Sequence, residues 1–154
     1  MTIPKKRNAT PAPPKLPETV RLTGTGVSTV LGELESKLMR LCWDAERPLT
    51  AREIHERLHD EHPVSPLTST TVLNRLVAKG FLARERVDGR YRFSARIEEA
   101  AFVLQVSRRA VEGLLSLGTE AVTASLVDVL AERNPAQLEE LARLVGRRMR
   151  EREK

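Results

Sequence analysis

The sequence has a single cysteine, Cys42, and aromatic residues make up only 3% of its 154 residues. One cysteine excludes an intramolecular disulfide framework and a zinc site built from several cysteines. Its place in an apolar helical pattern favours a buried thiol over a redox sensor. No apolar run approaches the about 18 residues of a membrane span, and the N-terminus lacks the apolar region of a signal peptide. We therefore expect a soluble, cytoplasmic protein without membrane insertion.

Signatures of catalysis are also missing. The eight glycines are scattered or lie in turn patterns, and none belongs to a glycine-rich phosphate loop. No serine or cysteine has a credible base partner for nucleophilic catalysis. We expect no enzymatic activity and no cofactor.

Positive charge is concentrated in one part of the chain. The whole sequence has 26 basic and 21 acidic residues, a net charge of +5. Residues 74–96 hold seven basic and two acidic side chains, so this segment alone carries +5. Such a local basic patch favours an anionic partner, most often nucleic acid. Residues 1–27 hold five of the nine prolines and predict a disordered basic arm, which either contacts DNA or only aids solubility.

Residues 28–96 begin with the pattern of two helices joined by a short extended link. Ser28 is the predicted N-cap of the first helix, whose apolar residues recur at helical spacing as far as Trp43. Thr50 and Glu53 have the spacing of a capping box and predict the start of the second helix.

A third helix and a hairpin follow. Ser65-Pro66 predicts an N-cap with proline at the first helical position, and Gly80 predicts the end of that helix. Asp88-Gly89 predicts a tight two-residue turn between strands at 81–87 and 90–94. The fold class expected for residues 28–96 is therefore a winged helix-turn-helix, in a chain that is mainly α-helical with a small β-wing.

The third helix leaves a polar face once its apolar residues are buried. Small hydroxyls near a helix N-terminus bond phosphates, and asparagine and arginine make bidentate contacts with adenine and guanine edges. Double-stranded DNA is therefore the expected partner. The residues predicted to bind it from this helix are Thr68, Thr70, Thr71, Asn74, Arg75 and Lys79.

Arginines also crowd the predicted wing. On an isolated hairpin they would only prevent pairing of its exposed edges. Beside a DNA-reading helix, Arg86, Arg90 and Arg92 are expected to reach the DNA backbone or minor groove. We expect Tyr91 and Phe93 to point to the other face and anchor the wing on the core.

Residues 97–150 predict a helical dimerisation domain. Its first helix carries two apolar stripes whose steps average about 3.5 residues, which suits packing against another helix. Asn134-Pro135 predicts the start of the last helix. These helices expose more apolar surface than so short a segment can bury, so we expect a two-fold homodimer. The predicted interface residues are Ile97, Ala101, Leu104, Val111, Leu115, Leu126, Val129, Leu141 and Leu144.

Three histidines raise the possibility of a metal site. His55-Glu56-Arg57-Leu58-His59 matches the helix string of zinc proteases, but no histidine outside residues 55–62 supplies a further ligand. We expect no catalytic metal. Two alternatives to DNA binding remain: a metal-responsive regulator that uses His55, His59 and His62, and a protein-interaction module whose wing docks an acidic partner.

Several short stretches together resemble the penicillinase repressor family of the BlaI/MecI type. They are Leu31-Gly32-Glu33-Leu34-Glu35, Leu38-Met39, Cys42-Trp43, Leu49–Ile54, Leu73–Gly80, Gly89–Phe93 and Asn134–Leu144. The resemblance implies a homodimeric transcriptional repressor that binds inverted repeats, often with TACA/TGTA cores.

In the best-known members of that family, a membrane-bound metalloprotease sensor triggers cleavage of the repressor, so such a sensor is a further implied partner. Ala101-Phe102 stands where those members have an Asn-Phe scissile bond. Pro66-Leu67 and Ser69 differ from the family's usual Tyr-Thr-Thr-Val opening of the recognition helix. The relief of repression and the operator sequence therefore stay open.

Overall fold

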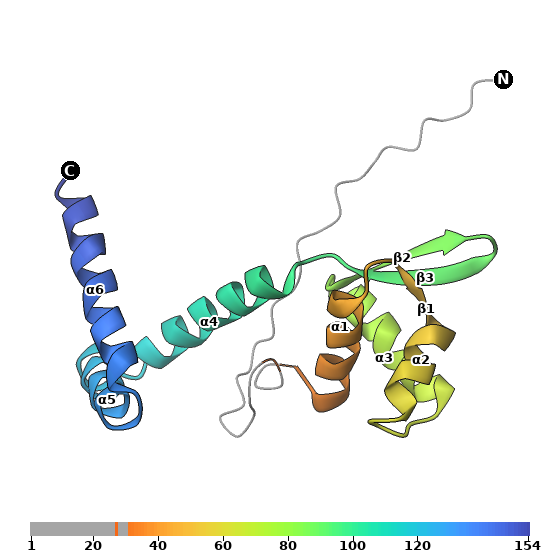
Figure 1. The fold of residues 1–154 in the computed structure, drawn as a ribbon, viewed down its shortest axis with the longest axis horizontal. Helices are drawn as coiled ribbons and strands as arrows, with labels where there is room; N and C mark the ends of the chain where they lie inside the picture. Colours follow the sequence, from red (N-terminus) through yellow and green to blue (C-terminus); the bar gives the residue numbers. More distant parts are fainter. Residues whose placement is uncertain (1–26, 28–30) are drawn as a thin grey trace. The chain divides into compact units, whose positions relative to one another are not determined.

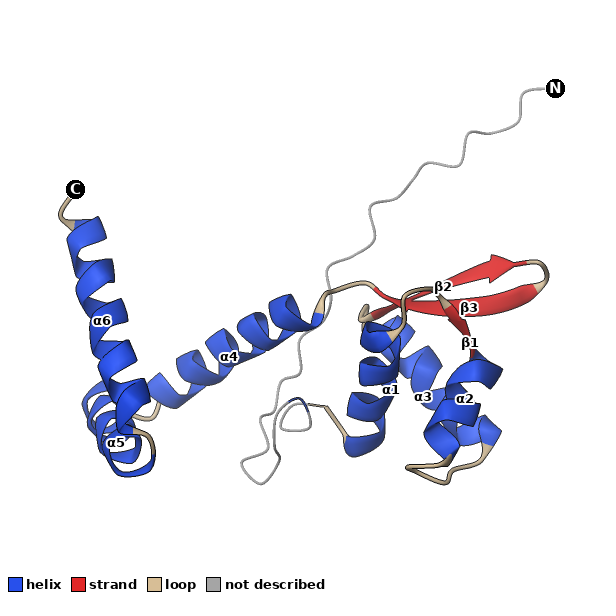
Figure 2. Ribbon diagram, viewed as in Figure 1, coloured by secondary structure: helices blue, strands red, loops and turns tan. Residues whose placement is uncertain are grey.

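A computed structural model describes residues 27 and 31–154, which form two compact units divided between Ser107 and Arg108. The described chain is mostly helical, with one three-stranded antiparallel sheet (Figures 1 and 2). In order, its elements are α1 (Glu33–Asp44), β1 (Leu49–Thr50), α2 (Ala51–His59), α3 (Pro66–Ala78), β2 (Leu82–Val87), β3 (Arg90–Ala95), α4 (Glu99–Leu115), α5 (Thr119–Arg133) and α6 (Pro135–Arg152). The predicted winged helix-turn-helix is confirmed.

The first helix starts later than predicted. Its N-cap is Gly32, whose backbone N–H donates to the carboxylate of Glu35 at 3.3 Å. Ser28, the predicted N-cap, lies outside the described residues, as does all of the predicted basic arm except Val27. Val27 is buried against the core, and its carbonyl accepts a hydrogen bond from the Leu31 N–H.

The caps of the next two helices are confirmed. Thr50 Oγ1 accepts from the Glu53 N–H at 3.2 Å, and the Glu53 carboxylate accepts from the Thr50 N–H at 2.8 Å. A hydrogen bond from Arg47, followed by those from Thr50, lowers the pKa of Glu53 to about 2. At α3, Ser65 Oγ accepts from the Thr68 N–H at 3.1 Å, directly before proline in the first turn.

The hairpin packs on these helices through a small sheet of order β1-β3-β2. Leu49 pairs with Phe93, and Arg84 of β2 lies opposite Phe93 on its other side. Leu49 and Phe93 are buried, as are Leu73 and Phe81. The sheet thus closes the side of the core formed by α1, α2 and α3, and it holds the hairpin next to α3.

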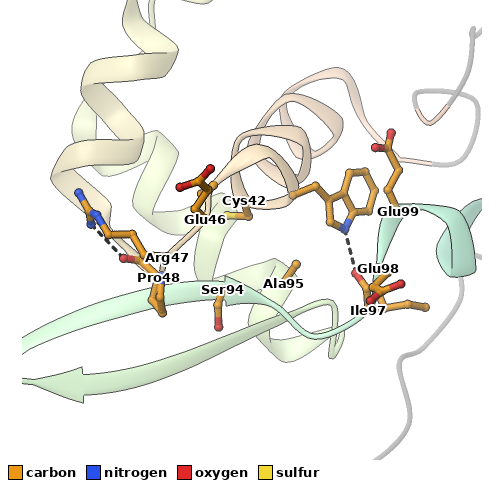
Figure 3. Close-up of a pocket in the computed structure, with 11 residues that line it drawn as sticks. Cys42, Glu46, Arg47, Pro48, Ser94, Ala95, Ile97, Glu98 and Glu99 are labelled. Atoms are coloured by element: carbon orange, nitrogen blue, oxygen red, sulfur yellow. Dashed lines mark hydrogen bonds between the residues drawn. The ribbon is translucent and has the colours of Figure 1, made fainter.

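The start of α4 belongs to the first unit. Phe102 is fully buried, with its ring centroid 5.5 Å from that of Trp43 and 5.3 Å from that of Phe81. The Trp43 indole N–H donates to the Ile97 carbonyl at 2.8 Å (Figure 3). The first compact unit accordingly extends past residue 96, the predicted domain boundary, to Ser107. Ile97, predicted to lie in a dimer interface, instead precedes α4 and packs partly on the core of the first unit.

The second unit contains α5, α6 and the end of α4. Asn134 caps α6 as predicted, because its side-chain oxygen accepts from the Gln137 N–H at 3.3 Å. Neither α5 nor α6 has a buried residue within the described chain. The two helices contact each other but enclose no core of their own.

Replacing Phe102 tests its place in the core. Phe102→Ala should lower the free energy of unfolding of the first unit by about 3–5 kcal/mol, because a ring is lost from a packed site. Denaturant unfolding followed by the fluorescence of Trp43, the chain's one tryptophan, measures this loss. Gln105→Ala on the same helix is the control; Gln105 is exposed, so a change below about 0.5 kcal/mol is expected. Equal losses in both variants would contradict the assignment.

The cap of α2 predicts a pH dependence. The pKa of Glu53 falls from 4.5 to about 2 on folding, so its contribution to stability is complete above pH 4.5 and is lost as pH falls from 4.5 towards 2. Glu53→Gln should therefore be less stable than the wild type at pH 7, with the difference shrinking at pH 3. Glu56→Gln, on the same helix, is the matched control. A constant difference for Glu53→Gln at both pH values would rule out the carboxylate as its source.

Candidate nucleic-acid interface

Helix α3 presents one polar face to solvent. Ser69, Val72, Leu73 and Leu76 are buried on its inner side. Four of the predicted DNA-binding residues are exposed, namely Thr68, Thr71, Asn74 and Arg75, whereas Thr70 is half-buried at the edge of the face. The structure thus brings most of the predicted helix residues onto one accessible stripe.

The hydroxyls of this face already have partners. Thr71 Oγ1 donates to the Leu67 carbonyl at 2.8 Å. The hydroxyls of Thr68 and Ser65 lie 2.8 Å apart and share a hydrogen bond. Because a phosphate only accepts hydrogen bonds, Thr71 must turn away from the Leu67 carbonyl before it can donate to one.

Lys79 differs from the other predicted residues. It lies at the C-cap of α3, and its Nζ is 2.7 Å from Glu35 Oε1. Glu35 is only 8% exposed, so this carboxylate needs a cationic partner. The ammonium group that we predicted to contact DNA therefore holds the end of α3 to the start of α1.

The turn at the wing tip has the predicted form. Asp88 and Gly89 have φ angles of 50° and 77°, which are the positive values that a type I′ turn needs. The resulting register places Arg86 opposite Tyr91, and Arg84 opposite Phe93. Since residues two apart on a strand share a face, these four side chains lie on the face that packs against the helices.

The interpretation of Tyr91 as a core anchor was wrong. Phe93 is buried, but Tyr91 is 49% exposed, because the hairpin extends past the edge of the core. The Tyr91 ring instead supports two arginines, with the guanidinium carbons of Arg84 and Arg86 at 4.6 and 5.9 Å from its centroid. Arg84 and Arg86 therefore share a face of the wing with Tyr91 and Phe93.

Arg90 and Arg92 lie on the other face of the wing. Arg90 is exposed beside the turn. Arg92 is half-buried between Thr50 of β1 and Glu85 of β2. Its Nε is buried and has no hydrogen-bond partner within the described residues. Of the predicted wing arginines, Arg86 alone lies on the face shared with Phe93.

Two exposed residues at the interface were not predicted. Arg84 Nη1 donates to Asn74 Oδ1 at 2.8 Å and so joins the wing to α3. Leu67 is 77% exposed in the first turn of α3. This exposed leucine could have been recognised in the sequence, because it directly follows the helix-starting proline at a position that the helical pattern does not predict to be buried. Apolar contact with the thymine methyl group is one way in which proteins read bases in the major groove.

The histidines do not converge. His55 Nδ1 is 3.2 Å from Ser69 Oγ, and the rings of His55 and His59 lie 5.9 Å apart. His62 Nδ1 is instead 4.0 Å from a carboxylate oxygen of Glu33 on α1. Across residues 27 and 31–154, no group of three or more histidine, cysteine or acidic side chains is placed to hold a metal ion.

A cavity of about 340 Å³ lies beside Cys42 and Ile97, with Glu46, Glu98 and Glu99 at its rim (Figure 3). Burial raises the pKa of the Cys42 thiol to about 11, so the sulfur stays protonated and unreactive at neutral pH.

Within the described part of the chain, no helix has the length and apolar character of a membrane span.

Comparisons with known proteins found relatives of this chain in two bacterial species. The transcriptional regulator BlaI of Mycobacterium tuberculosis is 35% identical over 66 residues, which are 43% of this chain and 48% of that protein. The chain thus aligns with about half the length of these relatives. A 16.5 kDa protein of Latilactobacillus sakei is 26% identical over 109 residues, which are 70% of this chain and 74% of that protein.

Among solved structures, one match is the transcriptional regulator Tm0710 from Thermotoga maritima. The match covers 70% of this chain and 77% of that chain, with 22% sequence identity and a TM-score of 0.39. The family model for the penicillinase repressor matches residues 31–147. Because this match covers more than half of the chain, the protein belongs to the penicillinase repressor family.

Proposed function

We propose that this protein is a transcriptional repressor that binds inverted-repeat duplex DNA as a homodimer. The observation that carries the proposal is the exposed polar face of α3 beside an arginine-bearing wing on one compact unit. Family membership supports the same function. An α-helix fits the major groove, and a wing beside it reaches the flanking backbone or minor groove.

The exposed side chains suit different parts of a duplex. Arg75 lies on the outer stripe of α3, where a bidentate contact with guanine is possible. Arg86 and Arg90 are exposed along the wing and suit phosphate contacts, which are independent of sequence. Lys79 is left out of this interface, because its charge is already paired with Glu35.

The second unit supports dimerisation. Its apolar side chains are exposed in numbers that a stable monomer does not leave uncovered. Those with more than a third of their surface exposed include Val111, Leu114, Leu115, Leu117, Leu126, Val127, Val129, Leu144, Val145 and Met149. A second copy would bury these faces and would place two winged helices at two half-sites, as an inverted repeat requires.

Of the other predicted interface residues, Leu104 and Ala101 are exposed on α4, and Leu141 is half-buried on α6. Ala101 lies next to Phe102, whose backbone N–H donates to the Glu98 carbonyl and whose ring is buried in the core. Cleavage of the Ala101-Phe102 bond by a membrane-bound sensor would require the first turn of α4 to leave that core. We therefore propose that repression is relieved by a route other than cleavage of this bond.

Two arginine variants separate base contacts from phosphate contacts. Arg75→Ala should cost about 1–3 kcal/mol of binding free energy on a selected duplex and little on a scrambled one. Arg90→Ala should weaken both duplexes and should reduce the slope of log K against log salt by about 0.9. Arg148→Ala, which removes the same charge from α6, is the control. Titrations of labelled duplexes over a range of salt concentrations measure all three.

The alternative of a protein-interaction module makes an opposite prediction for the wild type. Such a module would show no preference for an inverted repeat over scrambled duplex. Equal affinity for both duplexes at every salt concentration would therefore overturn the proposed function.

The dimer has its own test. Leu126→Asp should yield a monomer at concentrations where the wild type is a dimer, because a carboxylate would have to be buried in the apolar interface. Sedimentation equilibrium gives the mass. Leu67→Asp, which alters an equally apolar but more exposed leucine of α3, should leave the dimer intact. A wild type that is monomeric both with and without duplex would contradict dimerisation.

A further inference from the structure

The hydrogen bond between Arg84 and Asn74 joins two elements that would meet the same DNA. Arg84 projects from β2 and Asn74 from α3, and both side chains are exposed. Their contact, at 2.8 Å from Nη1 to Oδ1, has the length of a well-formed hydrogen bond. The Tyr91 ring supports the guanidinium of Arg84 at 4.6 Å. Arg84 is thus held from two sides.

This contact determines which way the Asn74 amide points. A guanidinium has only donors, so the amide atom that faces it must be the carbonyl oxygen. The Nδ2 group then points away from Arg84. The asparagine amide, which in isolation can turn either way, therefore presents its two N–H donors outward.

Together the two side chains form a surface of donors. An unconstrained asparagine reads adenine, because its oxygen accepts from N6 while its nitrogen donates to N7. With the positively charged guanidinium beside its oxygen, Asn74 is poorly placed to meet the adenine amino group. Guanine instead presents two acceptors, N7 and O6, in the major groove and complements a surface of donors.

We propose that Arg84 is a positioning residue that makes Asn74 select guanine rather than adenine. This inference rests on the proposed function, because it concerns a base within the bound duplex. A purely structural role is the competing explanation for the contact. An exposed pair of this kind contributes little to folding stability, so its effect should be seen in base preference rather than in unfolding.

The experiment is a selection of bound duplexes from a random library by the full-length protein and its variants. The position that loses its preference in Asn74→Ala identifies the base that Asn74 reads, and in the wild type this base should be guanine. Arg84→Ala frees the amide to turn, so the ratio of guanine to adenine at this position should fall by about tenfold. Arg84→Lys retains a donor for Asn74 Oδ1 and should restore the preference for guanine.

Two further variants make the result specific. Asn74→Asp would still pair with Arg84 but has no N–H to donate, so the preference for guanine should disappear. Arg90→Ala removes the same charge from the opposite face of the wing, so it should weaken binding to all duplexes alike and leave the ratio of guanine to adenine unchanged. Trp43 fluorescence during unfolding checks that each variant is folded.

The outcomes separate this inference from the proposed function. If the wild type selects no DNA motif, the proposed function is contradicted. A wild type that selects a motif, with the same base preference in Arg84→Ala, would overturn the positioning role and leave the proposed function standing. Adenine rather than guanine at the Asn74 position of the wild-type motif would also overturn it.

Discussion

Leu73 and Leu76 have no exposed surface, and their burial determines which side of α3 faces solvent. A helix that must bury two leucines in the core has little freedom to rotate about its axis. Rotation would expose their apolar side chains to water and leave gaps in the packed core. The outward direction of Asn74 and Arg75 follows from this constraint. The sheet then seals the same core through Phe93, so the wing is placed relative to α3 by the same packing.

The turn at the tip of the wing determines where the charged side chains of the wing lie. Positive φ angles at Asp88 and Gly89 specify the register of β2 and β3, and that register assigns each arginine to a face. Arg84 and Arg86 share the face of Phe93 and are steadied by the Tyr91 ring where the core no longer reaches. Arg92 lies on the opposite face, against Thr50 and Glu85. A shift of one residue in register would exchange the two sets.

Contacts between distant residues join the winged helix to the rest of the chain. Glu35 accepts from Gly32 at the start of α1 and from Lys79 at the end of α3, so one carboxylate serves two helix ends. Phe102 joins the first turns of α4 to Trp43 and Phe81. These contacts explain why the first unit extends to Ser107, whereas the apolar periodicity of α4 alone suggested a boundary at its start.

The sequence by itself determined the local features: the capping box at Thr50, the proline start of α3, the turn at Asp88-Gly89 and the asparagine cap of α6. Each depends on a few consecutive residues, whose steric and hydrogen-bonding preferences act without the rest of the chain. Only the tertiary structure decided that Tyr91 is exposed, that Lys79 pairs with Glu35 and that Arg84 meets Asn74. These outcomes depend on where the core ends and on which distant side chains meet around it, and periodicity along the sequence carries no information about either.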